Sequence, residues 1–446
     1  MKLPKRLLTQ SALIFAARLF GAGLIFVAQA AIARVWGSEI LGEYLLIMAT
    51  INLVAMVIPL GFNPIGTYFT ADYSAKKDGA MLWKFLLRSY GHITVVGLLF
   101  AVFGKSVVGL LGVPGEVVSE IWLPVALMAV ATAIIFVNSA LLVGLRRPIA
   151  GFFSEVLFRP ILVISSFAIV ALFLEGPDVL GSMIWILSLG YLIVAFFQLS
   201  MVVSSARSVP HDIPSKPADT KRWWKFAGPW VIIALATEFF FDIDLVLLAG
   251  QLDRQELAIF GICARIFSLM SFGVAAVYAV TLPDMFEAEA KNDRAGFHRK
   301  IGDANLVASG IALALVIVVA IGGQFLLRIF GSEFVAGTWP LVLMCGALLV
   351  RSVFGPATVV LSVHDRPYAS LPAVAFGLVS LVLLNLWLVP LFGLMGAAAA
   401  ALSAITLWSA GLWVTAWKVA GVDVSIMSRL RDRSGTKIQE ASLPSV

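Results

Sequence analysis

Long apolar runs recur along the whole chain and are separated by short polar or Gly/Pro-marked segments. Crossing about 30 Å of hydrocarbon takes about 20 apolar residues at about 1.5 Å of rise each. Strand periodicity is absent, and open sheets are excluded because lipid cannot satisfy unpaired backbone groups. The pattern predicts an all-α membrane protein with about twelve transmembrane helices, at residues 10–33, 40–67, 83–104, 120–144, 149–174, 180–204, 226–250, 256–283, 302–325, 338–361, 370–390 and 394–417.

Composition indicates the same environment. The 446 residues are 60% hydrophobic and 13% charged, whereas soluble domains are about 45–50% apolar and about 25% charged. A water-soluble protein of this length has too much surface to keep so many apolar side chains away from water. We therefore expect lipid to be the solvent for most of the chain.

The Lys and Arg residues fall mainly in alternate loops between the predicted spans. If the N-terminus lies inside the cell, the outside segments hold only Arg34, Lys105, Arg254 and Arg328. Because basic residues accumulate in cytoplasmic loops, both termini are predicted to be cytoplasmic in a multi-pass protein of a bacterial inner membrane. The formal net charge of +6 then reflects topology and attraction to anionic membrane lipids, and no nucleic-acid partner is expected.

The chain divides into two similar halves on either side of its longest polar interruption, residues 204–225. The stretch GSEILGEY at 37–44, which opens the second predicted helix, is similar to RQELAIFG at 254–261, which opens the eighth. We therefore predict an N-terminal six-helix lobe at 1–205, a cytoplasmic linker at 206–225, a C-terminal six-helix lobe at 226–420 and a disordered cytoplasmic tail at 421–446.

The two copies both run from outside to inside, so the predicted repeats are parallel. Parallel repeats related by an axis along the membrane normal are one of the plans that transporters use. Two such lobes would face each other across a central cavity that opens alternately to each side of the membrane. This architecture favours a transporter.

Four arginines lie deep in predicted spans: Arg18, Arg159, Arg265 and Arg351. An ionisable side chain in hydrocarbon is unfavourable unless it faces a partner or a cavity, and a guanidinium group binds phosphate oxygens in pairs. Arg18, Arg265 and Arg351 have no acid within a turn on their own helix, so they are candidate cavity ligands for an anionic, phosphate-bearing substrate. Glu155 lies four residues before Arg159, and we interpret that pair as structural.

Three acids, Glu238, Asp242 and Asp244, lie in the predicted seventh span. Glu238 and Asp242 are four residues apart and would share a helix face. Two interpretations remain open: the acids bind a coupling Na⁺ or H⁺, or they pair with Arg265 and Arg351. Asp244, near the outside end, could simply be solvated.

No pattern of catalytic, metal or cofactor chemistry is evident. There is no Gly-rich phosphate loop with its lysine, and the four histidines are too scattered for a metal site. The short predicted outside loops argue against a membrane glycosyl polymerase or ligase. We therefore expect no catalytic residue, no metal and no cofactor.

Two short motifs resemble a known family. Residues 33–44 read ARVWGSEILGEY, and residues 242–248 read DIDLVLL. The first is similar to the Ala-Arg-x-Leu-Gly-x-x-x-Phe-Gly-x-Tyr stretch of bacterial polysaccharide transporters, although Trp36 and Leu41 replace the commoner Leu and Phe. The second resembles the family's aspartate at the outer end of the seventh helix. These transporters include O-antigen (Wzx-like) flippases of the multidrug/oligosaccharidyl-lipid/polysaccharide exporter superfamily.

The resemblance implies a flippase that moves an undecaprenyl-diphosphate-linked oligosaccharide from the cytoplasmic to the periplasmic leaflet by alternating access. It also implies that Arg18 corresponds to a cavity arginine that holds the diphosphate. The partners would be this lipid-linked oligosaccharide and membrane lipids, with a polysaccharide polymerase and other assembly proteins as further candidates. The alternatives are a multidrug or cation antiporter of the same superfamily and, from another class, a membrane glycosyl polymerase or ligase.

Overall fold

The computed structural model describes residues 5–109, 112–174, 176, 178–211, 217–291, 293–364 and 366–428, and these residues form helices and no β-strand. Ten helical segments in this part of the chain are long and apolar enough to cross a membrane: 16–36, 38–57, 79–109, 122–144, 148–173, 179–207, 254–282, 296–327, 333–354 and 367–420. The fold is thus the all-helical, multi-pass class that the apolar runs predict. The count of twelve spans and the cytoplasmic termini stay predictions.

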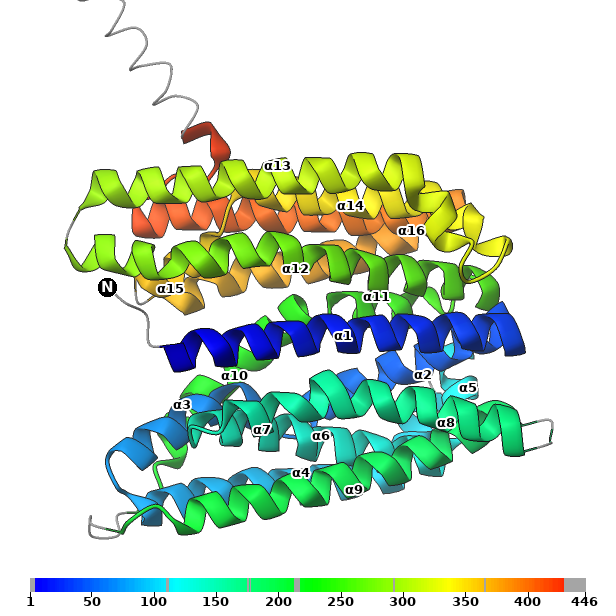
Figure 1. The fold of residues 1–446 in the computed structure, drawn as a ribbon, viewed down its shortest axis with the longest axis horizontal. Coiled ribbons are helices and arrows are strands. Elements are labelled where there is room, and N and C mark those ends of the chain that lie inside the picture. The colour runs from blue at the N-terminus through cyan, green and yellow to red at the C-terminus, as the bar shows by residue number, and fades with distance from the viewer. Residues whose placement is uncertain are drawn as a thin grey trace, which may run out of the picture. The chain divides into compact units, whose positions relative to one another are not determined.

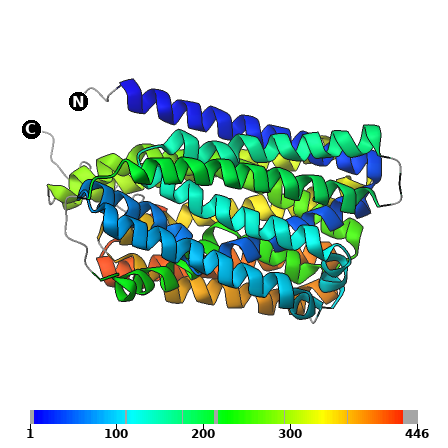
Figure 2. The same cartoon turned by 90° about the horizontal axis from the view of Figure 1, so that it is seen from below.

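The chain forms two compact units, residues 1–258 and 259–446. The helices of unit 1 are α1 (Lys5–Trp36), α2 (Ser38–Val57), α3 (Phe62–Ala75), α4 (Gly79–Gly109), α5 (Val113–Glu120), α6 (Trp122–Gly144), α7 (Pro148–Phe153), the π-helical turn η1 (Ser154–Phe158), α8 (Arg159–Phe173), α9 (Val179–Arg207), α10 (Thr220–Glu238) and α11 (Phe240–Leu248). The apolar helix α6 packs against α2, α3, α4, α7 and α9 and forms the centre of this unit. Figure 2 shows the blue-to-green helices of the unit running along one common direction.

Unit 2 contains most of α12 (Arg254–Ala290), then α13 (Arg294–Leu327), the 3₁₀ turn η2 (Glu333–Gly337), α14 (Thr338–Phe354), α15 (Ala357–Val363), the 3₁₀ turn η3 (Pro367–Ser370) and α16 (Leu371–Ala420). Within it, α14 packs between α13 and α16, and the three run alongside one another in Figure 1. The helix α16 covers both predicted spans 370–390 and 394–417, with a kink at Gly393, whose φ is 53°.

Three predicted spans are not single helices. The span predicted at 40–67 breaks between α2 and α3, where Pro59 lacks an amide donor and Gly61 has a φ of 85°. The span predicted at 226–250 breaks at Phe239, and the one at 338–361 breaks at Gly355, whose φ is 84°. Apolar content alone predicts each run as continuous because it carries no information on backbone dihedrals.

The described residues after α16 pack against the helices of unit 2, to which they belong. Val424 is 0% exposed, and its carbonyl accepts a hydrogen bond from Asn305 Nδ2. Asp423 Oδ1 accepts from the indole nitrogen of Trp413 at 2.8 Å and from the amide of Ser425 at 3.0 Å. The predicted disorder of the tail therefore does not extend to these residues, and residues 429–446 lie outside the described part.

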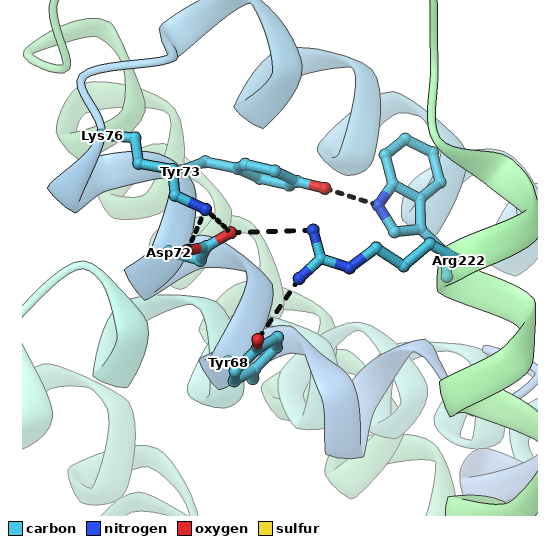
Figure 3. Close-up of polar contacts among 6 residues, drawn as sticks. Tyr68, Asp72, Tyr73, Lys76 and Arg222 are labelled. Atoms are coloured by element: carbon cyan, nitrogen blue, oxygen red, sulfur yellow. Dashed lines mark hydrogen bonds and ion pairs between the residues drawn. The ribbon is translucent and has the colours of Figure 1, made fainter.

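A polar network joins the end of α3 to the start of α10 (Figure 3). Arg222 donates to the hydroxyl of Tyr68 at 3.3 Å, and its Nη1 lies 4.0 Å from Asp72 Oδ2. Lys76 directly follows α3, and its Nζ lies 2.7 Å from Asp72 Oδ1. Such partly exposed ion pairs are each worth about 0–1 kcal/mol, so they orient the two helix ends more than they stabilise them.

The stronger contact of this region is buried. The indole nitrogen of Trp223 donates to the hydroxyl of Tyr73 at 2.7 Å, and the two residues are 0% and 5% exposed (Figure 3). Burial raises the pKa of Tyr73 above its ordinary value. The phenol is therefore neutral at physiological pH and serves as a stable acceptor.

Replacing Tyr73 by phenylalanine is expected to destabilise the protein by about 1–3 kcal/mol, because the buried Trp223 indole loses its acceptor. The measurement is the thermal unfolding midpoint of the purified protein in detergent. Tyr68→Phe is the matched control: Tyr68 is 52% exposed, so the loss of its hydroxyl should change stability by less than about 0.5 kcal/mol. Equal midpoints for the two variants would contradict the assignment.

Candidate functional site

The polar centre of unit 1 is a chain of hydrogen bonds that joins three helices. Arg159 begins α8, and its Nη2 donates to Asn52 Oδ1 of α2 at 2.7 Å. Asn52 Nδ2 in turn donates to Asp242 Oδ2 of α11 at 3.2 Å. Asn52 and Asp242 are 3% and 8% exposed. The amide thus bridges a cation and an anion, each of which would be unfavourable alone in apolar surroundings.

The arginine also meets an aromatic ring. Arg159 Cζ lies 6.0 Å from the ring centroid of Tyr191, which is 2% exposed, at the outer limit of a cation–π contact. Glu155 lies close enough to Arg159 for electrostatic attraction, and both line a small pocket with Tyr191 and Ser154. Whether the Glu155–Arg159 pair is purely structural stays a prediction.

The π-helical turn η1 determines how these side chains are presented. The amide of Arg159 donates to the carbonyl of Ser154, five residues earlier. Gln198 of α9 donates to the Ser154 hydroxyl at 2.6 Å and to the Ala150 carbonyl at 3.2 Å. A π-turn changes the register of a helix and is frequent at functional sites. Here it gives Glu155 and Arg159 directions that a regular α-helix would not.

Arg18 is near two of the predicted acids. Its side chain is exposed near the middle of α1, and its Cζ lies 5.2 Å from the ring centroid of Phe152. Both Glu155 and Glu238 lie within electrostatic range of its guanidinium group. The side chains of Arg18, Glu155 and Glu238, from three segments of unit 1, therefore influence one another electrostatically.

A close approach of backbones supports this grouping. Gly21 lies one turn after Arg18 on α1, and a Cβ at this position would overlap the carbonyl oxygen of Val156 in η1. Only glycine lets α1 come this close to the π-turn. The contact is consistent with the position of Arg18 over Phe152, which precedes that turn, and within electrostatic range of Glu155, which belongs to it.

The acids of the predicted seventh span do not share one helix. Glu238 is the last residue of α10 and is exposed, whereas Asp242 and Asp244 belong to α11. The break at Phe239 means that the expected common face of Glu238 and Asp242 is wrong. Asp244 is 0% exposed, which excludes a simply solvated side chain.

In unit 2, Arg351 lies in the last turn of α14, just before Gly355. Its side chain is exposed, and its Cζ lies 5.8 Å from the ring centroid of Trp408. It is within electrostatic range of Tyr278, whose hydroxyl donates to Asn305 Oδ1 at 3.1 Å. A cation near a helix C-terminus is favourable, so this position is less costly than the middle of a continuous helix.

Arg265 lies on α12 and is partly exposed. Its immediate chain neighbours Ala264 and Ile266 are buried, at 6% and 1% exposure. Its predicted contact with a substrate stays a prediction. The described residues contain no group of three His, Cys, Asp or Glu side chains that could hold a metal ion.

Sequence reasoning missed the neutral partners of these arginines because it considered charged residues alone. Asn52 lies in an apolar run, and a buried amide in such a run needs partners. The polar amide of Asn52 within an apolar run could therefore have identified this residue as a partner from the sequence. Tyr191, Tyr278 and Trp408 carry no comparable signal, since aromatic residues are common in membrane helices and only the fold shows which of them meet an arginine.

Comparison with known proteins gives consistent similarities. The family described as "Polysaccharide biosynthesis protein" matches residues 7–289. The "Probable low-salt glycan biosynthesis flippase Agl15" of Haloferax volcanii is 22% identical over 393 residues, which cover 87% of this chain and 78% of that protein.

Two solved structures have a similar fold. An inward-facing multidrug resistance MATE family transporter of the MOP superfamily has a TM-score of 0.73 at 13% identity, with 90% of this chain and 95% of that chain covered. The lipid II flippase MurJ in an inward closed conformation has a TM-score of 0.69 at 14% identity, with 98% and 94% covered.

Proposed function

Because the chain belongs to the polysaccharide biosynthesis protein family, we propose that it is a flippase for a lipid-linked oligosaccharide, and a transporter rather than an enzyme. The archaeal relative named as a glycan biosynthesis flippase supports this class of substrate. The finer proposal is an undecaprenyl-diphosphate-linked oligosaccharide carried from the cytoplasmic to the periplasmic leaflet of a bacterial inner membrane. The two predicted lobes would alternate between inward and outward access, and the product would serve the assembly of surface polysaccharide.

The observation that carries the proposal is the exposure of Arg18 and Arg351 on apolar helices. An arginine of a membrane helix that is not enclosed by protein faces either lipid, which is unfavourable, or water and ligand. The planar guanidinium group binds two phosphate oxygens at once. We therefore propose Arg18 of unit 1 as a ligand of the diphosphate, and Arg351 and Arg265 of unit 2 each remain a proposed substrate ligand in their own unit.

We propose different roles for Asp242 and Glu238. Asp242 is engaged with Asn52, which links it to Arg159, so its charge is already offset within unit 1. Glu238 is exposed and within range of Arg18. Glu238 is therefore the better candidate for a coupling cation or proton, which would compete with Arg18 for the carboxylate.

Replacing Arg18 by alanine is expected to reduce flipping of a lipid-linked diphosphate oligosaccharide by about tenfold or more, the effect of losing a charge-assisted contact. The measurement is translocation in proteoliposomes at matched protein content. Arg34→Ala, on the same helix and also exposed, is the control and should retain transport. Unchanged flipping in Arg18→Ala would refute the assignment.

The fold is also that of multidrug transporters, and the acids near Arg18 favour this as the second candidate. An antiporter would transport an amphipathic cation in the same proteoliposomes, and Glu238→Gln would abolish that transport. Cation transport without any flipping of the lipid-linked substrate would replace the flippase proposal.

A further inference from the structure

Unit 1 contains a second hollow, separate from the arginine cluster, between α4 and the start of α10. It has a volume of about 550 Å³, whereas a water molecule occupies about 30 Å³ of liquid. Leu60 and Trp223 line it along with residues of α4. The hollow is thus large enough for a polar headgroup and not only for solvent.

The side of the hollow formed by α4 carries basic side chains in helical register. Lys84, Arg88 and His92 are spaced four residues apart and all line the hollow, so they form one stripe along α4. The described residues that line it include no Asp or Glu. Arg88 is exposed and makes one long hydrogen bond, 3.5 Å to the Thr220 hydroxyl, which leaves donors for a ligand.

The floor of the hollow is open at Gly91. A Cβ at this position would meet no other atom within 4 Å. Packing within the protein therefore does not require glycine here, and the space beside it is empty of protein atoms. Along α4, Gly91 lies between Arg88 and His92, and all three residues line the hollow. A ligand could therefore approach the helix backbone next to the two nitrogen-bearing side chains.

The apolar face of α4 continues from the hollow along the helix. Leu87, Val95, Leu98 and Val102 are 69%, 59%, 62% and 67% exposed, and their spacing places them on one face of the helix. Such exposure is unfavourable in water and normal against acyl chains. The N-terminal part of α4 thus carries the basic side chains, and an exposed apolar surface that acyl chains can contact continues toward its C-terminus.

We propose that this hollow binds an anionic glycerophospholipid, with its phosphate on Arg88 and Lys84 and an acyl chain along Val95 and Leu98. The commitment to a lipid rests on the charge of the hollow and on its continuity with the apolar face. On the predicted orientation the lipid belongs to the cytoplasmic leaflet. The proposal is independent of the flippase function, because it concerns binding and not translocation.

The test is native mass spectrometry of the full-length protein in detergent, titrated with phosphatidylglycerol or phosphatidylcholine of equal chain length. Phosphatidylglycerol is expected to bind about tenfold more tightly, and Arg88→Gln is expected to lower that affinity about tenfold. Lys105→Gln, which removes an exposed cation from the same helix outside the hollow, should leave it unchanged. Equal affinity for the two lipids, or no effect of Arg88→Gln, would overturn the proposal.

Because Arg88 also bonds Thr220, a second variant leaves both charges in place. Gly91→Leu should occupy the part of the hollow beside Gly91 and weaken phosphatidylglycerol binding about tenfold, whereas Gly310→Leu, at an exposed glycine of α13 that also has open space around it, should not. Displacement of the lipid by inorganic phosphate at equal concentration would show a free anion site instead. Displacement by a polyprenyl diphosphate at lower concentration would assign the hollow to the transport substrate. Either result would overturn the phospholipid assignment.

Discussion

Replacing Arg159 by methionine is expected to lower the stability of the protein by about 3 kcal/mol, the effect of removing one charged member from a buried network. Asn52 loses the donor to its Oδ1, and the Asp242 carboxylate loses the cation to which Asn52 links it. Since about 1 kcal/mol corresponds to about 2–4 °C for a domain of this size, the thermal midpoint in detergent should fall by about 6–12 °C.

Two further variants identify the cause of that loss. Arg207→Met removes an exposed arginine at the end of α9 and should shift the midpoint by less than 2 °C, or about 0.5 kcal/mol. Adding Asp242→Asn to Arg159→Met should restore part of the stability, because the carboxylate that Asn52 links to Arg159 is then neutral as well. If Arg159→Met unfolds at the same temperature as Arg207→Met, the hydrogen-bond chain does not stabilise unit 1.

The sequence predicts the helical class because lipid leaves the backbone so few alternatives. Runs such as 120–144 and 180–204 agree closely with α6 and α9. The predicted spans run through all three breaks, since a count of apolar residues does not record whether the next dihedral is helical. Pro59 and Pro356 are visible signals that a span can bend at two of these places, and the positive φ values of Gly61 and Gly355 show that the helix ends there. The break at Phe239 carries no such signal.

The site was predicted only in part. The charged residues stand out in apolar runs, which is why Arg18, Arg159 and Arg351 could be selected from sequence. Their partners depend on contacts between distant segments: Asn52 is 107 residues from Arg159, and Asp242 is 190 residues from Asn52. The π-turn depends on a single change of hydrogen-bond register in α7–α8. Helical spacing alone therefore could not predict how Glu155 and Arg159 are presented.

The contact between α1 and the π-turn leads to a second large expected effect. Valine in place of Gly21 would force its side chain into the Val156 carbonyl, and backbone on both sides of the contact leaves little freedom to move. Overpacking typically costs about 1–3 kcal/mol and occasionally more; against a backbone atom we expect about 3 kcal/mol. The yield of folded protein, measured by fluorescence-detected size exclusion, should fall steeply.

Gly23 is a close control, because it lies two residues further along α1, is exposed, and has no atom within 4 Å of its would-be Cβ. Gly23→Val carries the same change in helix propensity and should fold at nearly normal yield.

A smaller substitution, Gly21→Ala, tests whether the same contact also affects transport. If α1 moves away to relieve the overlap, Arg18 moves away from Glu155 and Phe152. Folded Gly21→Ala should then flip substrate more slowly than Gly23→Ala. Equal yields and equal rates for the two positions would mean that the close approach of α1 to the π-turn neither holds unit 1 together nor positions Arg18.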